Sequence, residues 1–142
     1  MSKVAVVYWS GTGNTEAMAS AVVDGVREGG AEAELFTASE FDASMLSSFD
    51  AVAFGCPSMG SEQLEDSEFE PMFNSCEGDL GGKKIALFGS YGWGDGKWMR
   101  SWEETCTADG AVLVTESVIC NDAPSDDAIA ECKALGAALA AV

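Results

Sequence analysis

Short apolar runs alternate with longer segments of helical periodicity along the chain. The apolar runs predict strands at residues 3–9, 32–37, 50–55, 83–89 and 111–119. Apolar spacing and capping residues predict helices at residues 14–28, 42–48, 68–76, 97–109 and 125–141. Five β-α units in succession predict an α/β fold, a doubly wound five-stranded parallel sheet with helices on both faces.

The continuous apolar character of VAVVYW, AVAFG and KIALFG predicts strands that are buried on both sides. Because no repeat, linker or low-complexity tract interrupts the pattern, residues 1–142 are expected to form a single domain. Ligands of a doubly wound sheet bind beyond the carboxyl ends of the strands, where the strand order reverses. Three segments rich in glycine and small polar residues follow strands there, at residues 10–15, 55–71 and 89–98.

The first segment, SGTGNT, leads from an apolar run into a predicted helix. Backbone N–H groups converge at such a turn, and the helix dipole favours an anion. The segment contains no Lys or Arg and matches neither the P-loop nor the dinucleotide motif, so it predicts a cradle for one unreactive phosphate. An ordinary capped β-to-α turn explains this segment alone equally well. The predicted phosphate-binding residues are Ser10, Gly11, Thr12, Gly13, Asn14 and Thr15.

The third segment presents Trp93 between two glycines, Gly92 and Gly94. Little neighbouring bulk would shield the indole, so it suits stacking on a flat heteroaromatic ring, worth about 0.5–1.5 kcal/mol beyond area burial. Asp95 and Gly96 complete a turn that holds the loop's shape. The alternative interpretation is an indole folded back onto the core.

The second segment contains Ser58-Met59-Gly60-Ser61, which predicts a turn with a positive φ at Gly60. A glycine there lets the Met59-Gly60 peptide rotate between two turn types at little steric cost, which makes it a candidate conformational switch. A plain surface turn is the alternative. Glu62 could accept an N–H from the edge of a ring. The acidic residues after it are interpreted mostly as a solvated face that disfavours extra negative charge on a bound group.

The chain has seven Lys and Arg against 24 Asp and Glu, a net charge of −17, and no His. Nucleic acid and anionic membrane surfaces would repel it. The charge favours steering toward basic partner proteins, or serves only for solvation.

The five cysteines are odd in number and nowhere in CxxC spacing. This disfavours a disulfide framework, a zinc site or a cysteine-ligated cluster, so we expect reduced, mostly buried thiols and no metal. The N-terminal apolar run is too short for a signal peptide, and no apolar stretch of membrane length follows. The sequence thus predicts a cytoplasmic protein.

Together the three segments resemble the flavodoxin family, specifically the short-chain type found in anaerobic bacteria. YWSGTGNTEAMA, GCPSMGSEQLEDSEFEP and LFGSYGWGDGKWM carry the resemblance, which covers essentially all 142 residues. It implies strand order 2-1-3-4-5 and a non-covalent FMN whose phosphate lies in the loop at 10–15. It also implies a flavin ring between Met59 and Trp93, with Glu62 bonded to the ring N3–H. The full set of expected contacts beyond the phosphate loop is Pro57, Ser58, Met59, Gly60, Ser61, Glu62, Ser90, Tyr91, Gly92, Trp93, Gly94 and Asp95.

The resemblance further implies a function. On one-electron reduction the Met59-Gly60 carbonyl would turn toward the flavin N5–H and stabilise the neutral semiquinone. A low-potential carrier results, cycling mainly between the neutral semiquinone and the anionic hydroquinone. It would have no substrate of its own, act as a monomer and shuttle electrons between redox enzymes with basic docking faces.

The chain departs from many relatives in three places. Met59 stands where many have an aromatic residue, Ser61 where some have an acidic one, and Pro57 where some have a hydroxyl that helps bind phosphate. Trp9 is equally compatible with contacting the cofactor and with a core position.

Two other function classes share this topology. An FMN-dependent NAD(P)H quinone or nitro reductase would usually carry longer loops or a dimer-forming extension. A signalling receiver domain would need an Asp at the end of the third strand, where Phe54, Gly55 and Cys56 stand.

Overall fold

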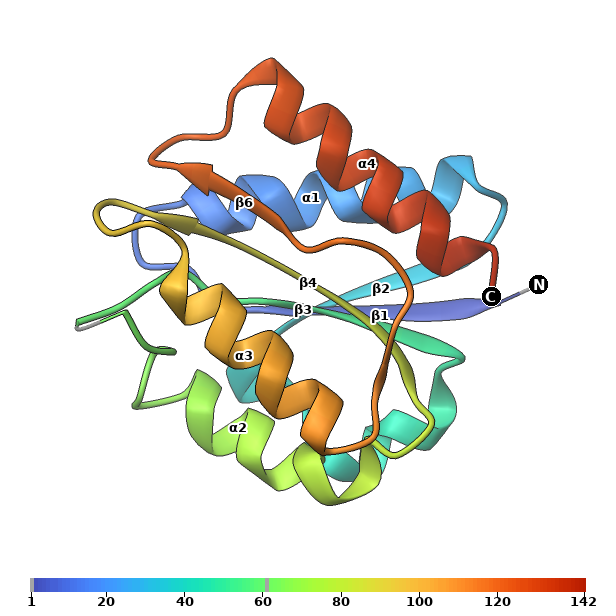
Figure 1. Ribbon diagram of the computed structural model, residues 1–142. Coiled ribbons are helices and arrows are strands. Elements are labelled where there is room, and N and C mark those ends of the chain that lie inside the picture. Colours follow the sequence, from blue (N-terminus) through green and yellow to red (C-terminus); the bar gives the residue numbers. More distant parts are fainter. Residues whose placement is uncertain (1, 61) are drawn as a thin grey trace.

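The strands form a parallel sheet in the computed structural model, which describes residues 2–60 and 62–142 (Figure 1). The strands are β1 (Lys3–Tyr8), β2 (Glu32–Thr37), β3 (Ala51–Gly55), β4 (Lys84–Tyr91), β5 (Val112–Leu113) and β6 (Val118–Asn121). Their order is β2-β1-β3-β4-β5, and β6 also pairs with β4. The predicted α/β fold and strand order are confirmed.

Helices cover both faces of this sheet. They are α1 (Asn14–Glu28), α2 (Phe69–Cys76), α3 (Lys97–Ala108) and α4 (Asp126–Ala140), with short 3-10 helices η1 (Ala38–Glu40), η2 (Ala43–Ser48) and η3 (Glu77–Asp79). In Figure 1, α1 and α4 lie on one face, and α2 and α3 lie on the other. Among the described residues, no helix combines the length and the apolar character that a bilayer span requires.

The alternation of side chains along β1 explains the two-sided burial. Val4 and Val6 pack in the apolar cluster beneath α1 and α4, whereas Ala5 and Val7 pack in the cluster beneath α2 and α3. All four are fully buried. Because successive side chains of a strand point to opposite faces, an uninterrupted apolar run serves both layers.

The prediction of one continuous fifth strand at residues 111–119 was wrong. The chain pairs with the start of β4 through β5 and with its end through β6, and leaves the ladder between them. Thr115, Glu116 and Ser117 occupy most of this interval, and the Ser117 hydroxyl donates to Glu103 of α3 at 2.6 Å. A polar side chain bonded to the α3 layer therefore interrupts the apolar strand pattern.

The helix predicted at 42–48 is present as the 3-10 helix η2. Asp42 begins it by accepting a hydrogen bond from the Ser44 backbone N–H at 2.9 Å. Together with η1, it returns the chain from β2 to β3 on the α2 side of the sheet.

The five cysteines are free thiols. Cys120 is half-buried, and the other four are buried. Burial raises the pKa of the Cys106 thiol to about 12, because the thiolate would lose its hydration and nearby carboxylates would repel it.

Candidate functional site

The loops that follow β1, β3 and β4 meet at the carboxyl edge of the sheet (Figure 1). A cavity of about 210 Å³ opens between them. Its lining is Trp9, Gly11, Thr12, Asn14, Pro57, Ser58, Met59, Ser90, Tyr91, Gly92 and Asp122. Backbone hydrogen bonds hold the loops together: Ser58 N–H donates to Ser90 C=O at 2.9 Å, and Asp122 N–H donates to Tyr91 C=O at 2.8 Å.

The loop at 10–15 leaves the N-terminus of α1 without a side-chain cap. Gly13 is the N-cap residue and adopts φ +95°, a left-handed conformation that favours glycine. Its N–H donates to Ser10 Oγ at 3.0 Å, so the serine closes the loop instead of capping the helix. The uncapped N–H groups and the helix dipole are suited to an anion, which favours the phosphate cradle over an ordinary capped turn.

Thr15 and Ser90 join two of the loops beneath the cavity. Their hydroxyl oxygens lie 3.1 Å apart, and both side chains are buried. Buried hydroxyls are stable only when paired, so this bond fixes the start of α1 against the end of β4. The hydroxyl of Thr15 therefore points to Ser90, whereas the backbone N–H of Thr15 belongs to the uncapped first turn of α1.

A larger, more polar cavity of about 530 Å³ adjoins the first on the β2 side. The two share Trp9, Gly11 and Thr12 in their linings. The Trp9 indole N–H donates to Glu68 at 3.1 Å. A Cβ on Gly11 would lie 3.0 Å from the Trp9 ring, so a glycine there lets the loop pass the indole. Trp9 is half-buried between the two cavities, at the site and not only in the core.

The loop that carries Met59 is a tight hairpin. Met59 and Gln63 exchange backbone hydrogen bonds of 2.8 and 2.9 Å. Gly60 has φ +53°, which confirms the predicted positive φ, and Glu62 has φ +56°. Ser61, expected to contact the cofactor, lies outside the described residues. The Met59 carbonyl accepts the Gln63 N–H, so rotating the Met59-Gly60 peptide would require breaking that bond.

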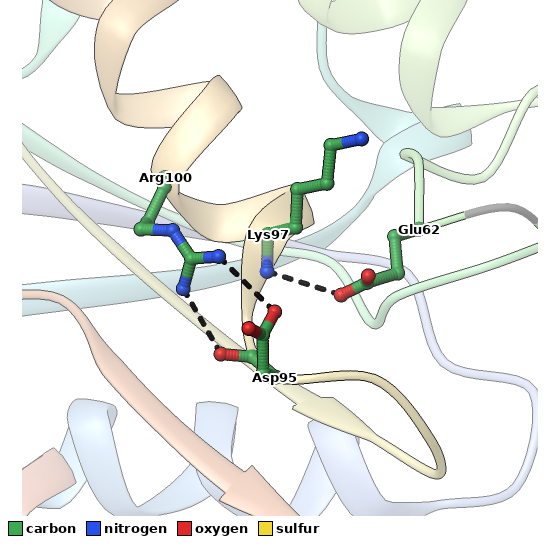
Figure 2. Close-up of polar contacts among 4 residues, drawn as sticks. All are labelled: Glu62, Asp95, Lys97 and Arg100. Atoms are coloured by element: carbon green, nitrogen blue, oxygen red, sulfur yellow. Dashed lines mark hydrogen bonds and ion pairs between the residues drawn. The ribbon is translucent and has the colours of Figure 1, made fainter.

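Trp93 is 64% exposed, so the indole is not folded back onto the core. Met59 is 37% exposed. Trp93, Gly94 and Asp95 stand outside the lining of the cavity. The Glu62 carboxylate reaches this loop, where it accepts the Lys97 backbone N–H at 3.0 Å (Figure 2).

Glycine at 94 makes this approach possible. Gly94 has φ +88°, and a Cβ there would lie 2.5 Å from the Glu62 carboxyl carbon. Glu62 therefore rests on the Gly94 backbone at the N-terminus of α3, where the helix dipole favours its charge. The hairpin at 59–63 and the loop at 92–96 are joined through this carboxylate.

One acidic residue of the second segment is not part of a solvated face. Glu65 is only 5% exposed, and its carboxylate accepts backbone N–H bonds from Ser67, Glu68 and Phe69 at 2.8–2.9 Å. Burial acts to raise the pKa of Glu65, but the hydrogen bonds from Ser67, Phe69 and Glu68 outweigh it and lower that pKa below its usual value. Glu65 is therefore an exception to the mostly solvated acidic run, because a local charge count does not reveal that the chain folds its own N–H groups onto the carboxylate.

Several lining residues were not predicted from the sequence. Asp122 lines the smaller cavity, and its φ of +57° places it in the left-handed region. Its position directly after the last strand was the available signal, because that strand ends at the same edge. The other unpredicted lining residues, Tyr8, Glu16, Thr37, Ala38, Ser39 and Glu68, belong to the larger cavity.

The chain is similar to known proteins over nearly its whole length. Residues 6–136 match the family model described as flavodoxin. A flavodoxin of Megasphaera elsdenii is 45% identical, covering 96% of this chain and 98% of the relative, and one of Clostridium beijerinckii is 44% identical, covering 95% and 97%. The solution structure of the two-electron reduced Megasphaera elsdenii flavodoxin superposes with a TM-score of 0.91 at 46% identity, covering 98% of this chain and 99% of that one.

Proposed function

Because this chain belongs to the flavodoxin family, it binds FMN and transfers electrons without transforming a substrate, and we propose that it cycles mainly between the neutral semiquinone and the anionic hydroquinone of that flavin. Bound FMN supplies the redox chemistry. The protein holds the flavin and sets the relative stability of its charged and neutral states. The observation that supports this proposal most is the meeting of three distinct loops around one cavity at the carboxyl edge of the sheet.

The loop at 10–15 would hold the phosphate. Its support is the uncapped α1 N-terminus together with the positive φ of Gly13. No Lys or Arg occurs in the loop, so backbone N–H groups and the hydroxyls of Ser10 and Thr12 would supply the binding free energy. A neutral cradle suits a phosphate that takes no part in the reaction.

Met59 and Trp93 would flank the isoalloxazine ring. Both side chains are exposed at the edge of the site, so each can lose water by packing on a flat ring. Glu62 would accept the ring N3–H. Stacking on an electron-rich indole and the neighbouring carboxylates would disfavour the extra negative charge of the fully reduced flavin, which lowers the potential of the second electron.

The Met59-Gly60 peptide would act as the switch between flavin states. Rotation would give up the 2.9 Å bond from Gln63 N–H to the Met59 carbonyl, a cost of about 0.5–1.5 kcal/mol. A hydrogen bond from flavin N5–H to the same carbonyl would compensate for that loss. Glycine at 60 keeps the steric cost of rotation small.

An anaerobic reductive titration of the purified protein with FMN tests the proposal. We expect the yellow protein to pass through a blue neutral semiquinone before it bleaches. Passage from yellow directly to the bleached form would contradict one-electron cycling. NAD(P)H with a quinone serves as the control, and no steady turnover is expected from the protein alone.

We also propose that the protein is a cytoplasmic monomer and that it exchanges electrons with partners whose docking faces are basic. The free thiols support a reducing compartment, and the net charge of −17 supports attraction to basic surfaces.

Electron-transfer rates with a basic partner should therefore fall steeply as ionic strength rises from about 0.01 to 0.3 M, because the Debye length shortens across that range. Stopped-flow kinetics with cytochrome c as a basic test acceptor measures this, and rates indifferent to salt would show that the charge serves only solubility.

A further inference from the structure

The loop that carries Trp93 is built from residues that leave its backbone free to move. Gly94 and Gly96 lie on either side of Asp95, and both adopt positive φ values, +88° and +92°. Glycine loses more conformational freedom on ordering than any other residue. A stacking partner on such a loop needs a restraint if it is to stay in place before the ring arrives.

Arg100, one turn into α3, provides such a restraint. Its Nη1 donates to the Asp95 backbone carbonyl at 3.0 Å, and its Nη2 donates to the Asp95 carboxylate at 3.1 Å. Figure 2 shows both bonds, with Glu62 reaching the Lys97 backbone N–H on the other side of the α3 N-terminus. The first turn of α3 thus holds the loop through Arg100 and also holds the carboxylate of Glu62.

The geometry of this contact matters more than its charge. Both side chains are more than half exposed, and an exposed ion pair contributes little by itself. The bond to the main-chain carbonyl is different, because it restrains the backbone between the two glycines directly. The planar fork of the guanidinium holds its two donors in fixed directions toward the two oxygens, whereas a lysine ammonium carries its donors at a single point on a flexible stem.

We propose that Arg100 is a positioning residue for flavin binding: through Asp95 it orders the loop so that Trp93 is prepared to stack on the ring. The proposal rests on the proposed function only in the role of Trp93. The ordering of the loop is a property of the protein alone. The two parts can therefore be measured separately.

The test compares Arg100→Met, Arg100→Lys and a control, Arg27→Met, which removes the same charge from the last turn of α1. Two quantities are measured: hydrogen exchange of the amides of residues 92–97 in the FMN-free protein, and the Kd for FMN. We expect both Arg100 variants to speed exchange by about threefold to tenfold and to raise the Kd by a similar factor, because each loses the two-pronged contact. The control should change neither.

Three results would overturn the proposal. Arg100→Lys behaving like the unsubstituted protein would show that the guanidinium fork is not required. Unchanged exchange in Arg100→Met would show that the loop is ordered without the arginine. Faster exchange with an unchanged Kd would show that the order of the loop has no consequence for the flavin. If the reductive titration fails while exchange responds as expected, the electron-cycling proposal fails and the restraint on the loop stands.

Discussion

Gly136→Ala is expected to lower the free energy of unfolding by about 3 kcal/mol or more, although alanine is the better helix former. Gly136 lies inside α4, where a Cβ would come within 2.2 Å of the Val22 carbonyl oxygen and 2.8 Å of the Val26 nitrogen of α1. Those neighbours are backbone atoms of a helix and cannot move aside as a side chain would. The two helices would have to separate, which would loosen the apolar cluster that lies beneath them on the sheet.

Thermal and urea unfolding of the protein with and without FMN measure this effect. A loss of that size corresponds to a fall in Tm of about 10 °C. Gly78→Ala is the matched control, because a Cβ at Gly78 would meet nothing within 4 Å and its φ is not positive. A stabilised Gly136→Ala would contradict the close packing of α1 on α4. Because α1 begins at the phosphate loop, we also expect weaker FMN binding from this variant.

Glu65→Ala is expected to cost about 2–4 kcal/mol of unfolding free energy. Removing the buried carboxylate leaves the N–H groups of Ser67, Glu68 and Phe69 at the start of α2 without their acceptor. Glu65→Gln keeps one acceptor oxygen without the charge and should lose less. Asp66→Ala is the control, since Asp66 is exposed and should change stability by no more than about 0.5 kcal/mol.

The pH dependence of stability gives a second readout for Glu65. Its pKa is lowered in the folded protein, so its contribution is present above the unfolded carboxyl pKa and is lost as pH falls through the folded value. The unsubstituted protein should therefore lose stability below about pH 4.5 more steeply than Glu65→Gln. Parallel acid unfolding curves for the two proteins would contradict the assigned role.

The sequence by itself determined the layered α/β architecture and the location of the site. An apolar run such as VAVVYW buries all of its side chains only between two helical layers, because successive side chains of a strand face opposite sides. Parallel strands bring their carboxyl ends to one edge, so loops separated by tens of residues could be assigned to one site. Glycine at 60 marked left-handed backbone in the predicted turn, and its φ is positive.

Tertiary structure alone decided which side chains meet. Helix propensity makes Gly136 unfavourable, and only the approach of α1 explains it. A local count of charges did not reveal the partners that Glu62 and Glu65 have within the chain, because those partners are backbone N–H donors that carry no signal in the sequence. Trp9 and Asp122 line the cavity because distant segments end at the same edge. The physical reason is the same in each case. Periodicity and composition record how a residue relates to its neighbours in the chain. Contacts at a site depend instead on the distances between helices and strands, which are set by packing.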